Sequence, residues 1–426
     1  MTPDTTDSSV ASSGPAGGAE TSDGAGASDG AATSDRAGAS DRAAVADSGA
    51  VTGSGAVTGG SDPASGGVPG GGAAAGGVAA AGQGAAATPE RGGTLGLARR
   101  RATSILQRYS LVALLGISIG VYGVWGKTSS VFLSAPDFRN IASSQAVLVV
   151  LTLGLIIPMI SGSLDLSIGN AAGLSSVATA AFYAHGHVPL LVGALLGVLV
   201  GAIVGIVNGL LVVLLRVDSF IITLGTASAI FGIVIWYTGG QSIVLGIPQS
   251  LLSFGGGNVI GIPDSVYVVV IVAFLVWYLL EQTPFGRSLH AVGSNKAAAR
   301  LVGIRVERVT FAAFVLSGAF AGLAGVLLLA SSGAGNPQIG QNFTLTAVAA
   351  AFLGAASFKV GRLNVLGSIV AILFLAVNIT GLTFAGVADW INQLFTGVAL
   401  VAAIAFATAL HRERRPRARS TAQDSP

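Results

Sequence analysis

Long apolar runs separated by short polar stretches dominate the chain from residue 109 to residue 410. Most runs are close to the ~20 residues that a helix needs to cross the hydrocarbon core of a bilayer. The pattern predicts an all-α polytopic membrane protein with about ten transmembrane helices, at 109–126, 141–160, 164–184, 189–215, 220–238, 266–281, 309–331, 344–358, 364–384 and 388–410. The run at 344–358 is short enough to form a broken or re-entrant element.

Glycine recurs at every fourth position in the run 189–215, at Gly193, Gly197, Gly201, Gly205 and Gly209. This spacing leaves a smooth stripe along one helix face and predicts close packing against another helix rather than a role in substrate binding. Gly318 and Gly322 repeat the spacing in the run 309–331.

Both ends of the chain are polar. Residues 1–90 are almost wholly Gly, Ala, Ser, Thr and Asp, so they bury too little apolar surface to fold, and we expect a disordered cytoplasmic tail. The segment lacks the basic start and short apolar core of a signal peptide, so no cleavage is expected. The basic tail 411–426 is also predicted to be unfolded, which leaves 91–410 as the transmembrane domain.

The composition supports lipid as the solvent, because only 10% of the residues are charged, against ~25% in soluble domains. After Glu90 there are twenty basic and nine acidic residues. Basic loops favour the cytoplasm, so ten spans place both termini, Arg216, the loop 282–308 and the Lys359/Arg362 loop inside. Lys127 and Arg139 are exceptions. The basic residues are scattered between apolar runs, which argues against a nucleic-acid partner.

The chain offers no enzymatic site that we can identify. It has no cysteine, and therefore no disulfide, thiolate nucleophile or Cys-ligated metal. Gly126, Lys127 and Thr128 end like a phosphate-binding loop, but Val121 stands where its first glycine should be. We expect no nucleotide site, metal or cofactor.

The loop 282–308 differs from the others because it is basic and interrupted by small residues. Asn295 is suited to cap a helix over Lys296 to Leu301, and Gly303 to end it. Ala297–Ala299 would leave a surface without bulk on a helix that lies in a groove of a partner. The alternative is an ordinary positive-inside loop.

This loop resembles the cytoplasmic loop of ribose- and xylose-type ABC permeases, within the branched-chain and monosaccharide permease superfamily. The matching positions are Gly286, Arg287, Ala291, Gly293, Asn295, Ala298, Ala299, Arg300, Leu301, Gly303 and Ile304. In that family the loop forms the coupling helix that docks on the ATPase. The broader importer pattern begins with a glutamate where this chain has Ala297.

The resemblance extends through most of 141–410. Residues 161–170 resemble the family segment Gly-Gly-Ile-Asp-Leu-Ser-Val-Gly, with Ser163 replacing one glycine, and 208–243 also match. In the similar region 337–384, many relatives have Tyr-Glu-Leu-Asp-Ala where this chain has Phe-Thr-Leu-Thr-Ala at 343–347. The loss of two carboxylates there leaves the substrate open.

The resemblance implies the permease subunit of an ABC importer for a small sugar. Its partners would be a cytoplasmic ATPase, an extracytoplasmic binding protein, a second permease copy in a homodimer or heterodimer, and membrane lipid. Autoinducer-like furanosyl compounds and small polyols stay open as substrates. The alternatives are an ion-coupled secondary transporter, which usually needs intramembrane charges, and a membrane scaffold that transports nothing.

Asp165 is the one plausible buried acid, and an ionisable residue at membrane depth is a candidate functional site. The alternative is that Asp165 caps the next helix at the membrane surface. Other candidates for the substrate path are polar residues dispersed in apolar runs, although such residues also bridge helices. They are Ser167, Asn208, Thr223, Thr226, Asn336 and Asn378.

Overall fold

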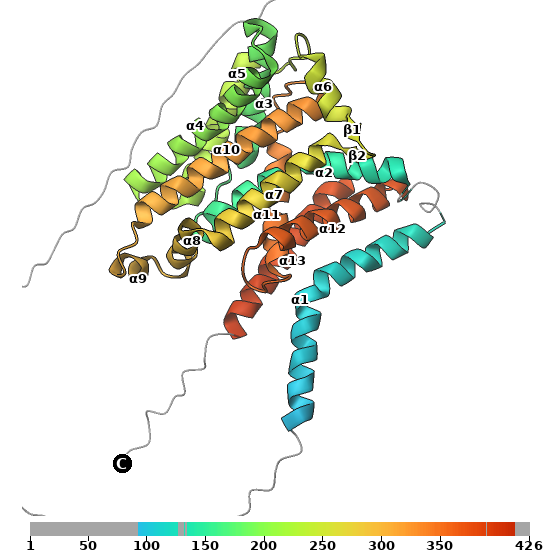
Figure 1. The fold of residues 1–426 in the computed structure, drawn as a ribbon, viewed down its shortest axis with the longest axis vertical. Coiled ribbons are helices and arrows are strands. Elements are labelled where there is room, and N and C mark those ends of the chain that lie inside the picture. The colour runs from blue at the N-terminus through green and yellow to red at the C-terminus, as the bar shows by residue number, and fades with distance from the viewer. Residues whose placement is uncertain (1–92, 127–131, 133, 389, 414–426) are drawn as a thin grey trace, which may run out of the picture. The chain divides into compact units, whose positions relative to one another are not determined.

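The computed structural model describes residues 93–126, 132, 134–388 and 390–413 (Figure 1). The predicted disordered segment 1–90 and residues 414–426 of the predicted tail lie outside the described residues. The long helices are α1 (Gly93–Val124), α2 (Ala135–Ile160), α3 (Ile168–Gly186), α4 (Leu190–Leu215), α5 (Ser219–Thr238), α7 (Asp264–Gln282), α10 (Val306–Ser332), α11 (Gln341–Ala355), α12 (Val365–Phe384) and α13 (Trp390–Glu413). Shorter elements are α6 (Gln249–Gly256), β1 (Asn258–Val259), β2 (Ile262–Pro263), α8 (Pro284–Ser294) and α9 (Lys296–Leu301).

Six of the described helices are long and apolar enough to cross a membrane: α2, α4, α5, α7, α10 and α12. α1 and α13 contain shorter apolar stretches, Arg108–Val124 and Trp390–Ala405. α3 and α11 are in neither group. The all-helical class predicted from the pattern is therefore seen, but only part of the predicted set of spans meets the length and composition of a membrane-crossing helix.

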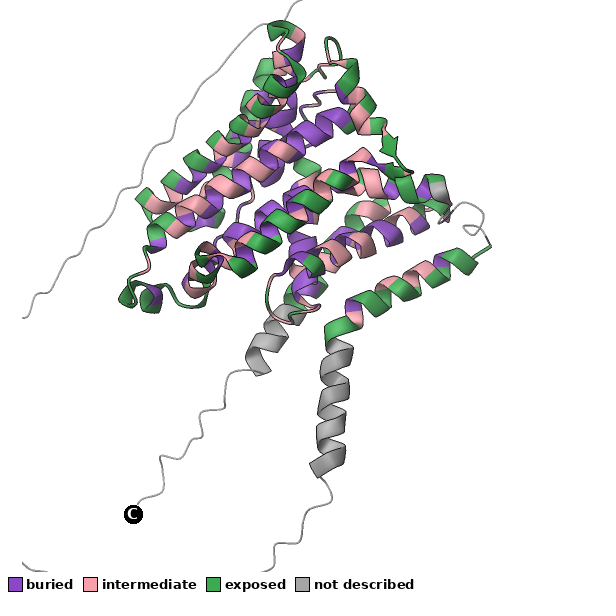
Figure 2. Ribbon diagram, viewed as in Figure 1, coloured by how far each residue is buried: buried purple, intermediate pink, exposed green. Residues whose placement is uncertain are grey.

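α2 and α10 form the centre of the helix assembly. Their most apolar stretches are 72% and 67% buried, against 22% in α4 and α7, and Figure 2 shows α10 largely in the colour of buried residues. Large apolar side chains on α4, α5 and α7 stay exposed, among them Leu195, Ile221 and Phe274. An exposed apolar surface of this extent fits a lipid environment.

The glycine stripe of α4 packs against α10, as its spacing predicts. A Cβ at Gly201 would lie 2.4 Å from Gly318 O and from Gly322 Cα, and one at Gly205 would lie 2.3 Å from Phe314 O. Two helix backbones approach this closely only when neither carries a side chain at the contact. Gly318 and Gly322 are the glycines of α10 that meet the α4 stripe.

Two breaks in the helices adjoin α3. The first is 161–167, between α2 and α3, so the run predicted to be helical from 164 begins as a turn and becomes helical only at Ile168. The second is 333–340, which is not helical and runs antiparallel along α3. Gly335 lies against Ala180 and Gly340 against Gly169. α11 therefore begins beside the first turn of α3, which explains the short run predicted at 344–358.

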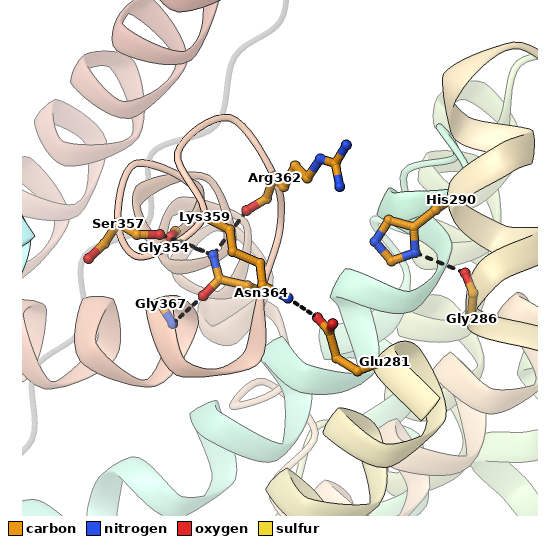
Figure 3. A network of polar contacts seen from close by, with 9 residues as sticks. All are labelled: Glu281, Gly286, His290, Gly354, Ser357, Lys359, Arg362, Asn364 and Gly367. Carbon is orange, nitrogen blue, oxygen red and sulfur yellow. Dashed lines mark hydrogen bonds and ion pairs between the residues drawn. The ribbon is translucent and has the colours of Figure 1, made fainter. Parts of the chain in front are cut away.

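Basic residues from distant parts of the chain gather at one end of the helices, here called the basic end: Arg108, Arg216, the segment 284–308, Lys359 and Arg362. Phe358 N donates to Arg108 O at 2.9 Å, and Lys359 pairs with Glu281 at the end of α7 (Figure 3). Arg216 lines the same cavity as Lys296 and Arg300.

The turn between α11 and α12 at the basic end is held by Asn364. Its Nδ2 donates to the carbonyls of Gly354, Ser357 and Arg362 at 3.0–3.3 Å, and its Oδ1 accepts from Gly367 N at 2.7 Å (Figure 3). Asn364 thus caps α12 and closes the preceding turn with one side chain.

The ends of the first and last helices differ from the sequence predictions. α1 begins at Gly93, well before the span predicted from 109, and includes Arg99 to Arg101. α13 continues to Glu413, so His411, Arg412 and Glu413 are helical rather than part of an unfolded tail. Apolar runs define the part of a helix inside the hydrocarbon, whereas helical hydrogen bonding can continue beyond it.

Candidate functional site

Asp165 lies in the break between α2 and α3 and is 2% exposed. Its Oδ1 accepts hydrogen bonds from Ser167 N at 3.0 Å and Ser167 Oγ at 2.7 Å, and its Oδ2 accepts one from Ser317 Oγ of α10 at 3.0 Å. Asn208 Nδ2 of α4 donates to Ser167 Oγ at 2.6 Å. The carboxylate therefore connects the break to α10 directly and to α4 through Ser167. Hydroxyl and amide donors replace the water that the buried carboxylate has lost.

Thr223 and Ser219 of α5 hold the other side of the same break. Ser219 Oγ accepts from Leu164 N at 2.9 Å, and Thr223 Oγ1 accepts from Leu166 N at 3.0 Å. These two amides lie outside any helix, so side chains from α5 supply the partners that secondary structure would otherwise give. Four of the predicted residues, Asp165, Ser167, Asn208 and Thr223, are thus brought to one junction.

Asp165 combines a contact with the start of α3 and a bond to another helix. It does accept a hydrogen bond from the backbone of Ser167, the N-cap of α3. It is also buried within the protein and bonded to Ser317 of α10. Its geometry is that of a structural junction that fixes where α3 begins.

A cavity of about 300 Å³ opens where the first turns of α3 and α11 face α5. We call it the junction cavity. Its polar lining consists of Asn170, Ser228, Gln341 and Thr344, and none of its lining residues is charged. The remaining lining residues are Leu166, Leu224, Ala227, Phe231 and Leu345.

The polar groups of the junction cavity are available for a ligand. Asn170 Nδ2 donates to Ala227 O at 2.8 Å, which fixes the amide, while its Oδ1 has no partner in the described part of the chain. The side chains of Gln341 and Thr344 likewise make no hydrogen bond to described residues. A few convergent polar groups in a mostly apolar cavity are typical of a small-molecule site.

Sequence reasoning missed Asn170, Ser228 and Gln341 as lining residues. Asn170 ends the segment 161–170 that carries the family resemblance, so its signal was present but unused. Thr344 was noted only as the residue that replaces a glutamate of the relatives, and the structure places it in the cavity wall.

The other three path candidates lie apart from the lining of the junction cavity. Thr226 Oγ1 donates to the carbonyl of Thr223 within α5. Asn336 lies in the break 333–340, where its Oδ1 accepts from Gln338 N at 2.9 Å. Asn378 Nδ2 donates to Phe374 O at 2.7 Å and pairs with Ser118 of α1 at 3.2 Å, so it bridges α1 and α12. Bridging is the common role of such residues in membranes.

The segment 282–308 forms two helices at the basic end rather than one. α8 contains Gly286, Arg287 and Gly293, and α9 contains Ala298, Ala299, Arg300 and Leu301. Asn295 caps α9 as predicted, because its Oδ1 accepts from Ala297 N at 2.9 Å and Ala298 N at 3.1 Å. Gly303 ends α9 as predicted with φ of +83°, and Ile304 N donates back to Ala299 O.

The surface of α9 differs from the prediction at one position. Ala299 is buried against Val292 and Val306 and offers no surface to a partner. Leu301 and Val302 are instead 88% and 74% exposed. The apolar surface of this segment therefore lies at its C-terminal end, beside the Arg300–Glu307 ion pair of 2.7 Å.

The comparison with known proteins decides the family. Residues 138–404 match the family described as the branched-chain amino acid transport system permease component. The chain belongs to this permease family. It is 33% identical to the ribose import permease protein RbsC of Bacillus subtilis over 64% of this chain and 85% of that protein. Identity is 34% to the probable ABC transporter permease protein YphD of Escherichia coli, over 69% of this chain and 88% of that protein.

A third relative is the autoinducer 2 import system permease protein LsrC of Salmonella typhi, which is 31% identical over 69% of this chain and 84% of that protein. No solved structure matches the chain. As a member of the permease family, the chain is the membrane component of an ABC importer and a multi-pass protein of the cytoplasmic membrane. It is not an enzyme, since a separate ATPase subunit hydrolyses ATP in these systems.

Proposed function

We propose that this permease conducts a small neutral sugar past the junction cavity while a partner ATPase drives it through α9. The observation that carries the proposal is a cavity without charged residues at the first turns of α3 and α11, each of which directly follows a helix break. In many transporters, discontinuous helices form the substrate site. The hydroxyls of a sugar can both donate to and accept from Asn170, Gln341 and Thr344.

The chemistry of the junction cavity favours a sugar over an amino acid. A branched-chain amino acid carries an ammonium group, and no carboxylate lines the cavity to receive it. The loss of the relatives' glutamate at position 344 increases this neutrality. The relatives named for ribose and autoinducer 2 import point to the same class of ligand.

The proposed topology has ten crossings with both termini in the cytoplasm. Basic residues favour the cytoplasm, and the basic end gathers Arg108, Arg216, Lys296 and Lys359 through direct contacts and a shared cavity. α3 and α11 would be the two incomplete crossings, each extended by a non-helical break. A cysteine introduced at Arg287 should be labelled only from the cytoplasmic side, and one introduced at Leu245 only from the outer side. The reverse labelling pattern would refute the orientation.

The proposed docking surface for the ATPase is the exposed apolar end of α9, Leu301 and Val302, flanked by Arg300. An extracytoplasmic binding protein would deliver the sugar to the opposite end, and a second permease copy would complete the path. ATP binding then closes the ATPase pair and moves α9, which changes access to the junction cavity.

The first test is affinity purification of the tagged full-length chain in mild detergent, with identification of bound proteins by mass spectrometry. We expect an ATPase with a phosphate-binding loop, lost in Leu301→Asp/Val302→Asp. The matched control is Leu245→Asp, which changes an equally exposed leucine (80%) between α5 and α6. Recovery of no ATPase after cross-linking, or equal loss in the control, would refute docking at α9.

The second test addresses the substrate. Uptake of radiolabelled D-ribose, D-xylose and D-galactose would be measured in cells that express the complete transporter. Thr344→Val, which removes one hydroxyl at nearly constant volume, should lower uptake of the transported sugar about tenfold, since a lost hydrogen bond in a site costs ~1–1.5 kcal/mol. Thr346→Val, next to the cavity but not in its wall, is the control. Unchanged uptake in Thr344→Val would remove the cavity from the path.

The same cells separate the rival functions. Uptake that survives ATP depletion but fails with an uncoupler would favour an ion-coupled carrier. The absence of any substrate-stimulated ATPase activity in the reconstituted complex would favour a scaffold.

A further inference from the structure

A second cavity, of about 220 Å³, lies at the basic end between α4, α9 and α10. We call it the basic cavity. Three cationic side chains line it, Arg216, Lys296 and Arg300, against one acid, Glu307. Glu307 is paired with Arg300 at 2.7 Å and also interacts electrostatically with Arg216. Arg216 and Lys296 form no ion pair among the described residues. The cavity therefore has an excess of two positive charges.

Two hydroxyl groups also line the basic cavity, those of Ser163 and Thr310. Neither hydroxyl makes a hydrogen bond within the described part of the chain. These two hydroxyls and the cationic groups of Arg216 and Lys296 could together bind the oxygens of one anion.

The surroundings of the basic cavity indicate where the anion comes from. Arg216 follows directly after α4, whose last residues Leu214 and Leu215 are 65% and 56% exposed. The cationic groups thus adjoin an exposed apolar helix surface. Basic cavities between membrane helices bind phosphate head groups of anionic lipids, while the acyl chains lie along the adjacent apolar surface.

We propose that the basic cavity is a binding site for the phosphate group of an anionic phospholipid. Arg216 and Lys296 would neutralise the phosphate, Ser163 and Thr310 would donate to its oxygens, and Leu214 and Leu215 would contact the acyl chains. The bound lipid would connect the end of α4 to α9 across the cavity. This site is separate from the junction cavity and does not depend on which substrate is transported.

The experiment titrates phosphatidylglycerol into the delipidated full-length protein in mild detergent and counts bound lipid by native mass spectrometry. Phosphatidylcholine, which has no net charge, is titrated in parallel. Arg216→Gln/Lys296→Gln should bind phosphatidylglycerol about 30-fold more weakly, because each basic residue near the membrane contributes ~1 kcal/mol and tenfold corresponds to ~1.4 kcal/mol. The matched control, Arg305→Gln/Arg308→Gln, removes two charges from exposed positions that do not line the cavity.

A second variant tests the hydroxyls without changing charge. Thr310→Val keeps the shape of the side chain and should weaken phosphatidylglycerol binding about tenfold, while phosphatidylcholine binding stays the same. Thermal unfolding of each variant confirms that it is folded. A variant that is folded but binds normally counts against the proposal.

Three results would overturn the proposal. The first is equal loss in the two double variants, which would mean general electrostatic attraction. The second is displacement of phosphatidylglycerol by inorganic phosphate at millimolar concentration, which would mean a site for a free anion. The third is unchanged lipid binding together with loss of the co-purifying ATPase in Arg216→Gln/Lys296→Gln, which would assign the cavity to an acidic side chain of that partner.

Discussion

Replacing Gly201 with alanine tests whether the contact between α4 and α10 stabilises the fold. The new Cβ would lie 2.4 Å from Gly318 O, Gly322 Cα and Gly322 N. Ordinary contact begins at 3.4 Å, so the two helices must separate by about 1 Å. All three opposing atoms belong to the backbone, so no flexible side chain can move aside to make room.

The expected loss follows from overpacking, which typically costs ~1–3 kcal/mol. A separation of ~1 Å also weakens dispersion contacts along the whole glycine stripe, because a gap of that size removes about a quarter to a half of the attractive energy of each contact. Gly201→Ala should therefore lower the free energy of unfolding by about 2 kcal/mol. The control is Gly232→Ala in α5, where a Cβ meets nothing within 4 Å. Alanine there should be neutral or stabilise by up to ~1 kcal/mol through helix propensity.

The assay is equilibrium unfolding of the purified protein by SDS in mixed micelles, followed by circular dichroism. A shift of the Gly201→Ala transition to lower SDS, with Gly232→Ala unchanged or shifted upward, is the expected result. If the two variants unfold together, the close approach of α4 and α10 contributes nothing measurable, and the glycine stripe needs another explanation.

Substitutions at three further positions have defined outcomes. Asp165→Asn keeps one acceptor and should preserve assembly, whereas Asp165→Ala orphans buried hydroxyls and should cost ~1–3 kcal/mol in the same unfolding assay; equal stability of the two would contradict the junction role. Gly293→Ala would place a Cβ 1.8 Å from Ile160 O, so α8 should detach from α2 and become sensitive to limited proteolysis, which an unchanged digestion pattern would disprove. Asn364→Ala removes the cap of α12 and should lower the unfolding free energy by ~2 kcal/mol; no shift would show that the turn between α11 and α12 contributes nothing.

The sequence predicted the features that depend on local chemistry. The spacing of Gly193 to Gly209 implied a close helix contact because period and residue size together define a smooth face. Asn295 and Gly303 implied the bounds of α9 because capping and left-handed backbone are local requirements. Apolar runs located the helices, although only six of the described helices have the length and composition of a membrane-crossing helix.

Features that depend on distant segments could not be predicted. Hydropathy gave no reason to expect that the break 333–340 would follow α3, because that path is set by contacts such as Gly340 with Gly169. The junction cavity was missed for the same reason, since Asn170 and Gln341 lie far apart in the sequence. The bond between Asn378 and Ser118, which joins α12 to α1, likewise depends on residues far apart in the sequence.

α10 also has a mechanical consequence. It begins five residues after α9 ends, and its Glu307 is tied to Arg300 of α9. Ser317 lies eleven residues after the start of α10, about 16 Å at 1.5 Å per residue, and donates a hydrogen bond to Asp165. One continuous helix therefore connects α9, the proposed docking segment, to the point where α3 begins. The glycine contact packs α4 against α10. A displacement of α9 would therefore move α10 and α4 together and change the position of Asp165 near the junction cavity.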